Sequence, residues 1–217
     1  MKSSTKKLTT IAMLSAIAFV IVAFVRIPVV MFLKYEPKDV IITVGGFMMG
    51  PLTSFLISFV VSLVEMVTIS DTGIYGAIMN LLSTCAFACT AAFIYKKKHT
   101  LKGAVIGLVS ATVLMTAVML LWNYIITPLY MGMPRAAVAE LLPTVFLPFN
   151  LFKGAVNAGI TLLIYKPVVG ALRNAHLIES SSSSAAKPGM LSAGPMLIAL
   201  VMVITGILLA LVAKGII

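Results

Sequence analysis

Polar side chains recur along one face of a long apolar stretch near residue 150. Asn150, Lys153 and Asn157 stand at i, i+3 and i+7, a spacing that places them on the same side of a helix. A cation or an amide inside an apolar helix is costly, and it marks a site or a pathway more often than it does in a soluble core. Two amides and one ammonium group suit a neutral ligand that is rich in hydrogen-bond donors and acceptors.

A second set of polar residues interrupts two other apolar stretches. Asn123, Tyr124 and Thr127 lie together near Tyr130, and Asn80 stands in an earlier stretch. Each amide alone could instead join neighbouring helices, where such a hydrogen bond is worth about 0.6 kcal/mol. As a group with aromatic neighbours, the polar residues favour a pocket for a planar heterocycle.

The segment 26–39 joins the first two apolar stretches. It contains the mixed-charge run Lys34-Tyr35-Glu36-Pro37-Lys38-Asp39. A proline restricts the backbone of this segment, and two interpretations are open. The segment is either a solvated external turn or a lid over the pocket, in which Tyr35 stacks on the ligand and Asp39 accepts hydrogen bonds.

The sequence lacks the motifs of several catalytic and metal sites. It has no G-x-x-x-x-G-K-[ST] phosphate loop, and His99 and His176 show no H-E-x-x-H spacing. Cys85 and Cys89 lie in one apolar stretch without metal-ligand spacing to a histidine, so we interpret them as packing residues. We predict that the chain is not an enzyme and needs neither a metal nor a cofactor.

The composition explains where these residues must lie. Of 217 residues, 61% are apolar and 10% are charged, and the mean hydropathy is +1.14. Soluble domains carry about 25% charged residues, so the chain is neither a soluble enzyme nor a disordered tail, and it is not a nucleic-acid-binding domain. We therefore read the net charge of +10 as a signal of membrane topology.

Apolar runs occur along the whole chain, and a helix of about 20 such residues spans a bilayer. The runs cover residues 8–25, 40–64, 74–95, 103–133, 141–165 and 196–213. The second run is interrupted at Gly45-Gly46 and at Gly50-Pro51, and a proline after a glycine commonly marks a turn between helices. A turn there also brings Lys96-Lys97-Lys98 to the side of the N-terminal lysines, as the positive-inside rule requires.

These runs predict an all-α integral membrane protein. We expect a six-helix transmembrane core, residues 1–175, with both core ends in the cytoplasm and with helices two and three short. Residues 176–195 form a low-complexity linker, and residues 196–217 hold an additional seventh helix. The N-terminal run is too long for a signal peptide and is followed by Arg26 without a cleavage site, so it is the first helix.

This topology places the polar residues at one depth. Asn80, Asn123, Asn150, Lys153 and Glu65 all fall in the outer halves of their helices, whereas the inner halves offer only small or weakly polar residues. The pocket is therefore expected to open to the outside.

Four separated motifs carry a resemblance to a known family. They are Lys34-Tyr35-Glu36-Pro37-x-Asp39, Met79-Asn80, Trp122-Asn123-Tyr124-x-x-Thr127-Pro128-x-Tyr130-Met131-Gly132 and Pro148-Phe149-Asn150-Leu151-x-Lys153-Gly154-x-x-Asn157. Over about residues 8–175 the chain resembles the riboflavin-specific substrate-binding (S) components of energy-coupling factor (ECF) vitamin transporters.

The resemblance implies a function and a set of partners. It implies a multi-pass protein of the bacterial cell membrane that captures riboflavin from outside, with Asn123, Asn150 and Lys153 on the flavin and Tyr35 and Asp39 as contacts from the first loop. The loaded component would dock on a transmembrane coupling protein that carries two ATPase subunits, and it would topple in the membrane to release the vitamin inside.

The first helix carries a candidate docking contact. Ala12-x-x-x-Ala16 is a small-xxx-small spacing that lets another helix approach closely, and the family uses an alanine pair at this spacing to dock its coupling protein. Packing against a neighbouring helix of the same chain is the alternative.

Two other functions remain open at this point. One is a self-sufficient secondary carrier in which Glu65 or Lys153 couples transport to protons. Such carriers often have internal repeats with sites at the bilayer midplane, which we do not find. The other is an S component for another vitamin, such as thiamine or folate.

Overall fold

The computed structural model describes residues 2–174 together with Leu200 and Ile204. The predicted linker, 176–195, and nearly all of the predicted seventh helix lie outside the described residues. The elements are α1 (Lys2–Phe24), β1 (Ile27–Val30), β2 (Leu33–Tyr35), α2 (Lys38–Met49), α3 (Pro51–Thr68), α4 (Gly73–Thr84), the π-helical turn η1 (Cys85–Cys89), α5 (Thr90–Lys97), α6 (Leu101–Met131), α7 (Arg135–Leu141), the π-helical turn η2 (Leu142–Phe146) and α8 (Leu147–Asn174).

Five helical stretches of the described chain are long and apolar enough to cross a membrane. They are Thr5–Phe24, Pro51–Thr68, Gly73–Lys97, Leu101–Met131 and Arg135–Tyr165. The helix α2 has 12 residues and so measures about 18 Å, which is shorter than the bilayer core of about 30 Å. The expectation of two short helices therefore holds for α2 but is wrong for α3, which has 18 residues.

The predicted turn at Gly50-Pro51 separates α2 from α3. Gly50 has a φ of 96°, a left-handed conformation that glycine adopts readily, and Pro51 occupies the first turn of α3, where its missing N–H is not needed. Gly46 allows the two helices to cross closely, because a Cβ there would lie 2.0 Å from the hydroxyl of Ser54 and 2.8 Å from the Cβ of Ala92.

The segment expected as an external loop contains a β-hairpin, so the all-α prediction is wrong here. β1 pairs with β2 in antiparallel fashion, with Ile27 opposite Tyr35. Met31 lies in the turn with a φ of 49°, which is uncommon for a residue other than glycine. The hairpin is held by burial, because Leu33 and Tyr35 pack in one cluster with Phe149 of α8.

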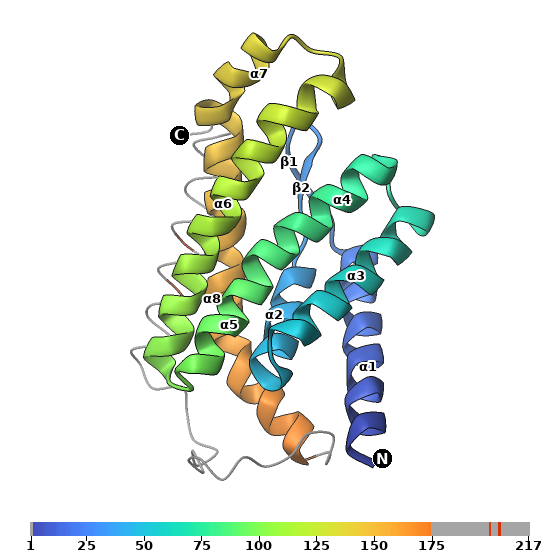
Figure 1. The fold of residues 1–217 in the computed structure, drawn as a ribbon, viewed down its shortest axis with the longest axis vertical. Helices are drawn as coiled ribbons and strands as arrows, with labels where there is room; N and C mark the ends of the chain where they lie inside the picture. Colours follow the sequence, from blue (N-terminus) through green and yellow to red (C-terminus); the bar gives the residue numbers. More distant parts are fainter. Residues whose placement is uncertain (1, 175–199, 201–203, 205–217) are drawn as a thin grey trace.

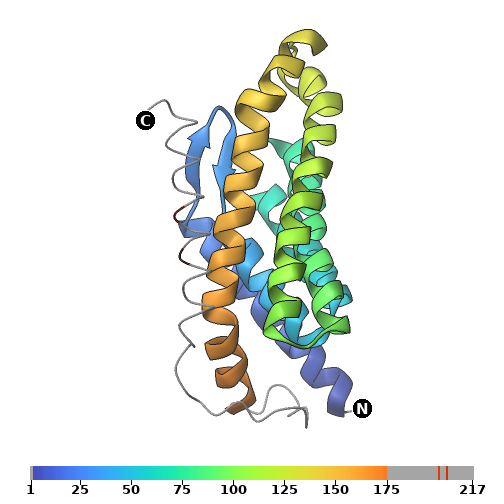
Figure 2. The same ribbon diagram turned by 90° about the vertical axis from the view of Figure 1, so that its left-hand side faces the viewer.

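The bundle has two distinct ends (Figure 1). The beginning of α1, the α2–α3 turn, the α5–α6 turn and the end of α8 lie at one end, whereas the hairpin and the α6–α7 turn lie at the other. Helices α6 and α8 run side by side (Figure 2), and Gly154 permits this contact, because a Cβ there would lie 2.4 Å from the methyl group of Thr112. The chain thus buries polar residues of α2, α4, α6 and α8 between tightly packed helices.

Candidate functional site

A buried carboxylate at the start of α2 organises one polar network. Asp39 is fully buried. Its Oδ1 accepts a hydrogen bond of 2.6 Å from the hydroxyl of Thr84, and its Oδ2 accepts one of 3.2 Å from Nδ2 of Asn157. The ammonium group of Lys153 lies 3.2 Å from the same Oδ2. Lys153 has no acidic neighbour on its own helix, so α2 supplies the compensating charge.

Tyr35 extends this network to the β-hairpin. Its hydroxyl donates a hydrogen bond of 2.9 Å to Oδ1 of Asn157, and its ring lies 5.5 Å from the ring of Phe152, centroid to centroid. Burial, with a smaller effect of the Asp39 carboxylate, raises the pKa of Tyr35 above its ordinary value. The neutral phenol therefore remains a donor, and it fixes the hairpin against α8.

A second cluster of charges lies beside the first and was not identified from the sequence. The ammonium group of Lys38 is fully buried and lies 2.8 Å from Glu36 and 2.5 Å from Glu65, while Nε of Arg26 lies 3.0 Å from Glu36. Burial alone would raise the pKa of Glu36, but Lys38, followed by Lys153 and Arg26, lowers it to about 2. These pairs anchor the end of the hairpin to α2 and α3.

A pocket lies between the hairpin, α4, α6 and α8, and we call it the polar cavity. It is lined by Leu33, Lys34, Met79, Asn80, Ser83, Met119, Phe149, Asn150 and Lys153. Lys153 donates a hydrogen bond of 3.2 Å to the hydroxyl of Ser83, and Asn80 donates one of 3.1 Å to Glu65. Two amides and an ammonium group therefore border the same pocket.

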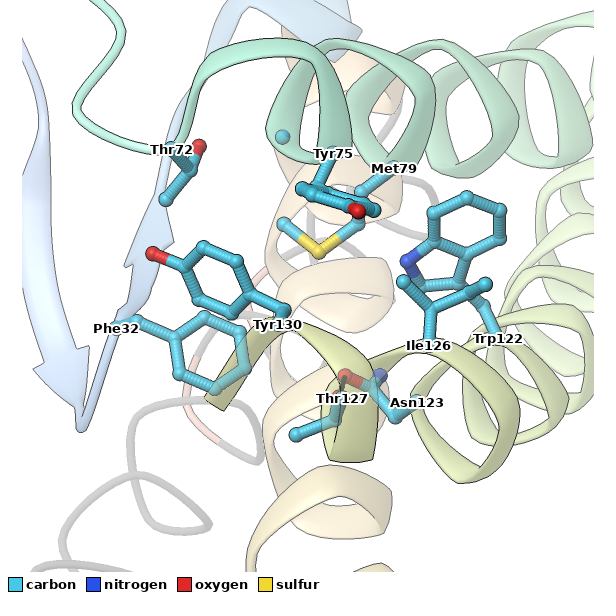
Figure 3. Close-up of a pocket in the computed structure, with 10 residues that line it drawn as sticks. Phe32, Thr72, Tyr75, Met79, Trp122, Asn123, Ile126, Thr127 and Tyr130 are labelled. Carbon is cyan, nitrogen blue, oxygen red and sulfur yellow. Dashed lines mark hydrogen bonds between the residues drawn. The ribbon is translucent and has the colours of Figure 1, made fainter. Parts of the chain in front are cut away.

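A second pocket adjoins the first, and we call it the aromatic cavity (Figure 3). It is lined by Phe32, Thr72, Tyr75, Gly76, Met79, Trp122, Asn123, Ile126, Thr127 and Tyr130. Met79 lines both cavities. The ring of Tyr130 lies 5.7 Å from that of Phe32 and 6.0 Å from that of Tyr75, so aromatic side chains form much of one wall.

Asn123 is the amide residue that lines the aromatic cavity. Asn123 is buried, its Nδ2 donates a hydrogen bond of 2.7 Å to the carbonyl of Met119, and its Oδ1 accepts one of 3.0 Å from Thr127. Figure 3 shows Asn123 and Thr127 side by side below Met79. These two hydrogen bonds hold the amide in one orientation.

The predicted site residues fall into three groups. Those that line a cavity are Asn80, Asn150 and Lys153 in the polar cavity, and Asn123 and Thr127 in the aromatic one. Tyr35, Asp39 and Asn157 form the buried network and line neither cavity. Tyr124 also lines neither: it is 39% exposed, and the guanidinium group of Arg135 lies 5.8 Å from the centre of its ring.

Several lining residues were missed in the sequence. Tyr75, Met79 and Ser83 follow one another at four-residue spacing along α4, which places them on one face of the helix. That periodicity was available as a signal, whereas the contribution of Phe32 depends on the hairpin, which the sequence did not indicate.

The alanine pair of α1 lies on the surface. Ala12 and Ala16 are both exposed in this chain, whereas Leu14 and Ala18 of the same helix are buried. Within the described residues, the pair therefore does not pack inside the bundle.

Comparison with known proteins gives a consistent result. A family model described as "ECF transporter, substrate-specific component" matches residues 6–165. The chain is 33% identical to "Riboflavin transporter RibU" of Staphylococcus aureus (strain TCH60) over 178 residues, which cover 77% of this chain and 93% of that protein. It is 29% identical to "Riboflavin transporter FmnP" of Bacillus subtilis (strain 168) over 188 residues, 79% of this chain and 98% of that protein.

A solved structure agrees with the sequence relatives. It is described as "Structure and mechanism of the S component of a bacterial ECF transporter". It is 32% identical to this chain, superposes with a TM-score of 0.66, and the match covers 78% of this chain and 99% of that one.

Proposed function

The chain belongs to the family of ECF transporter substrate-specific components, and from that premise we propose that its ligand is riboflavin. The relatives named above are riboflavin transporters. As a family member with several apolar helices long enough to cross a membrane, the chain is a multi-pass bacterial membrane protein and not an enzyme.

The pair of adjoining cavities carries this proposal. Riboflavin combines a flat tricyclic ring, an edge with carbonyl and N–H groups, and a polyhydroxylated chain. Aromatic side chains such as Trp122 and Tyr75 offer surfaces on which a flat ring stacks, while Asn80, Asn150 and Lys153 offer donors and acceptors. A mostly apolar cleft with a few placed polar groups is typical of a small-molecule site.

Within this proposal the predicted residues take different roles. Asn123, Thr127, Asn150, Lys153 and Asn80 contact the ligand, since they line the cavities. Tyr35, Asp39 and Asn157 act as positioning residues, because their hydrogen bonds fix Lys153 and the hairpin behind the cavity. We assign no ligand contact to Tyr124.

The orientation in the membrane follows from charge. The end of the bundle with the beginning of α1 and the α5–α6 turn (Figure 1) carries Lys6, Lys7, Lys96, Lys97 and Lys98, so by the positive-inside rule it faces the cytoplasm. Both ends of the six-helix unit then lie inside, and the cavities lie toward the external surface, where the vitamin arrives.

We propose that other proteins supply the energy of ATP hydrolysis, since this sequence has no phosphate-binding loop of its own. We assign the docking of a transmembrane coupling protein, with its two ATPase subunits, to the exposed pair Ala12 and Ala16. Small side chains let a second helix approach closely in a membrane, which a larger residue at either position would prevent.

Trp122 provides a direct test, because it is the single tryptophan of the chain and lines the aromatic cavity. Riboflavin added to the purified protein should quench Trp122 emission in a saturable manner, with submicromolar affinity. Trp122→Phe removes this signal and is the control, in which binding is followed by quenching of the flavin's own fluorescence. No saturable quenching by riboflavin would refute the proposal.

Competition separates riboflavin from other vitamins and from other modes of transport. Excess thiamine or folate should leave the riboflavin signal unchanged; displacement by either would reassign the ligand. If liposomes that contain only this chain accumulate riboflavin with a proton gradient, the chain is a secondary carrier instead.

A further inference from the structure

The cytoplasm-facing end of the described chain carries exposed lysines with no acidic partner. We define the basic end as Lys6 and Lys7 of α1, Lys96, Lys97 and Lys98 at the end of α5, and Lys102 of α6, all of them exposed. Each of the five ion pairs found among the described residues involves the hairpin, α2, α3, the α3–α4 turn or α8 instead.

The acidic residues of the described chain are all distant in sequence from the basic end. They are Glu36, Asp39, Glu65, Asp71 and Glu140. The first four belong to the ion pairs, and Glu140 lies in α7, at the opposite end of the bundle (Figure 1). The positive charge of the basic end is therefore not neutralised within this part of the chain.

The position of the Lys97 side chain shows that part of this charge faces the side of the bundle. Lys97 lies with its ammonium group 4.4 Å from the centre of the Phe93 ring, one turn back along α5, and Phe93 is 50% exposed. A helical side chain leans toward the N-terminus of its helix, so Lys97 lies along the side of the bundle beside an apolar surface. Lysine side chains that cover apolar surface with their aliphatic part are typical of the ends of membrane helices, near the headgroups.

The side chain of Lys96, also at the basic end, lies beside the α2–α3 turn. Its side-chain methylene carbon Cδ lies 3.9 Å from the position that a Cβ of residue 50 would occupy, so its aliphatic part covers the α2–α3 turn. The lysines thus surround the end of the bundle from α1, α5 and α6.

We propose that the basic end binds the headgroups of anionic phospholipids, such as phosphatidylglycerol, in the adjacent leaflet. Clusters of lysine next to transmembrane helices attract anionic lipids, and each lysine near the surface contributes about 1 kcal/mol. The lateral position of Lys97 favours a lipid over an acidic protein that would cap the end of the bundle. The proposal depends on membrane insertion and not on the identity of the vitamin.

The experiment measures the lipid selectivity of the full chain with spin-labelled phosphatidylglycerol and phosphatidylcholine in reconstituted membranes. The wild-type protein should prefer phosphatidylglycerol, and Lys97→Gln should reduce this preference by up to about fivefold. Arg135→Gln, the matched removal of one exposed charge at the opposite end, should leave it unchanged. Riboflavin binding is the folding control, since Lys97 lies outside both cavities.

A salt titration of the wild-type protein needs no variant. Raising the ionic strength from about 0.1 to 1 M shortens the Debye length from about 10 to about 3 Å and should abolish the preference. A preference that resists salt, or one that falls equally in both variants, overturns the proposal. If Lys97→Gln keeps its lipid selectivity but loses the energising subunits, the basic end is a protein interface instead.

Discussion

Replacement of Lys153 by methionine tests whether this residue contacts the ligand or only stabilises the bundle. Lys153 is 5% exposed, lines the polar cavity, and lies 3.2 Å from both the Asp39 carboxylate and the Ser83 hydroxyl. Lys153→Met retains an unbranched apolar side chain but removes the charge. The fully buried Asp39 then keeps only the hydrogen bonds from Thr84 and Asn157.

The cost of Lys153→Met in unfolding free energy can be measured separately from its cost in riboflavin affinity. Removing one partner of a buried ion pair costs about 3–5 kcal/mol, because the other charge stays buried without compensation. Asp39→Asn in the same chain removes that charge, so the double variant should recover most of the loss in the free energy of unfolding. A hydrogen bond from the ammonium group to riboflavin is worth about 1.5–3 kcal/mol. Lys153→Met and the double variant both lack this group, so each should bind riboflavin about 10- to 150-fold more weakly.

The assay combines thermal or denaturant unfolding in detergent with Trp122 quenching for the wild-type protein, both single variants and the double variant. We expect Lys153→Met to lose stability and affinity, and the double variant to regain stability only. If the double variant also regains riboflavin affinity to within about twofold of wild type, Lys153 does not contact the ligand, and its role is structural.

Further predictions concern packing, pH and docking. Gly154→Ala places a Cβ 2.4 Å from the methyl group of Thr112 and should cost about 1–3 kcal/mol of unfolding free energy, with Thr112→Ala restoring part of the loss. Glu36 has a folded-state pKa of about 2, below its ordinary 4.5, so its ionised form stabilises the protein above about pH 4.5. This contribution should disappear as the pH falls toward 2, and unfolding curves of Glu36→Gln should lack it. Ala16→Leu should abolish riboflavin uptake in cells while leaving binding unchanged; weaker binding would contradict a pure docking role.

Parts of the fold could be predicted because they depend on local sequence. Gly50 and Pro51 define a turn through their own backbone preferences, and charge parity independently required a turn there. The five predicted residues that line cavities, such as Asn123 and Lys153, were found because a polar group in an apolar helix is costly enough to indicate a site.

The hairpin and the buried ion pairs could not be predicted, for a different reason. The hairpin turn has no Asn-Gly or Asp-Gly signal, since Met31 takes the left-handed conformation, and the strands are stabilised by packing on α8. The pair of Lys38 and Glu65 joins residues 27 positions apart. Local spacing does not encode such contacts, so Lys38 was assigned only to a mixed-charge loop.

The position of Tyr124 shows that a residue within a sequence motif need not line the site, because neighbours on a helix face different directions. Tyr124 adjoins Asn123 in sequence, but neighbours on a helix point about 100° apart. Because Asn123 is buried toward the aromatic cavity, Tyr124 turns to the surface, whereas Trp122 on the other side lines the cavity. Of the two aromatic residues beside Asn123, Tyr124 was the one predicted from the sequence, whereas the structure places Trp122 at the aromatic cavity.

The distribution of small residues bears on how such a chain can function. At the end of the bundle that holds the α2–α3 and α5–α6 turns, small residues let the helices approach closely: Gly107 lies against the backbone carbonyl of Ala91, and Gly46 lies against the side chains of Ser54 and Ala92. Contacts of this kind are close and leave little free space, because only glycine, alanine and serine meet there. Both described cavities lie instead among the side chains of the opposite half, beside the hairpin. A ligand would have to separate these helices to cross the bundle, so movement of the whole loaded protein relative to a partner requires less internal rearrangement than passage through it.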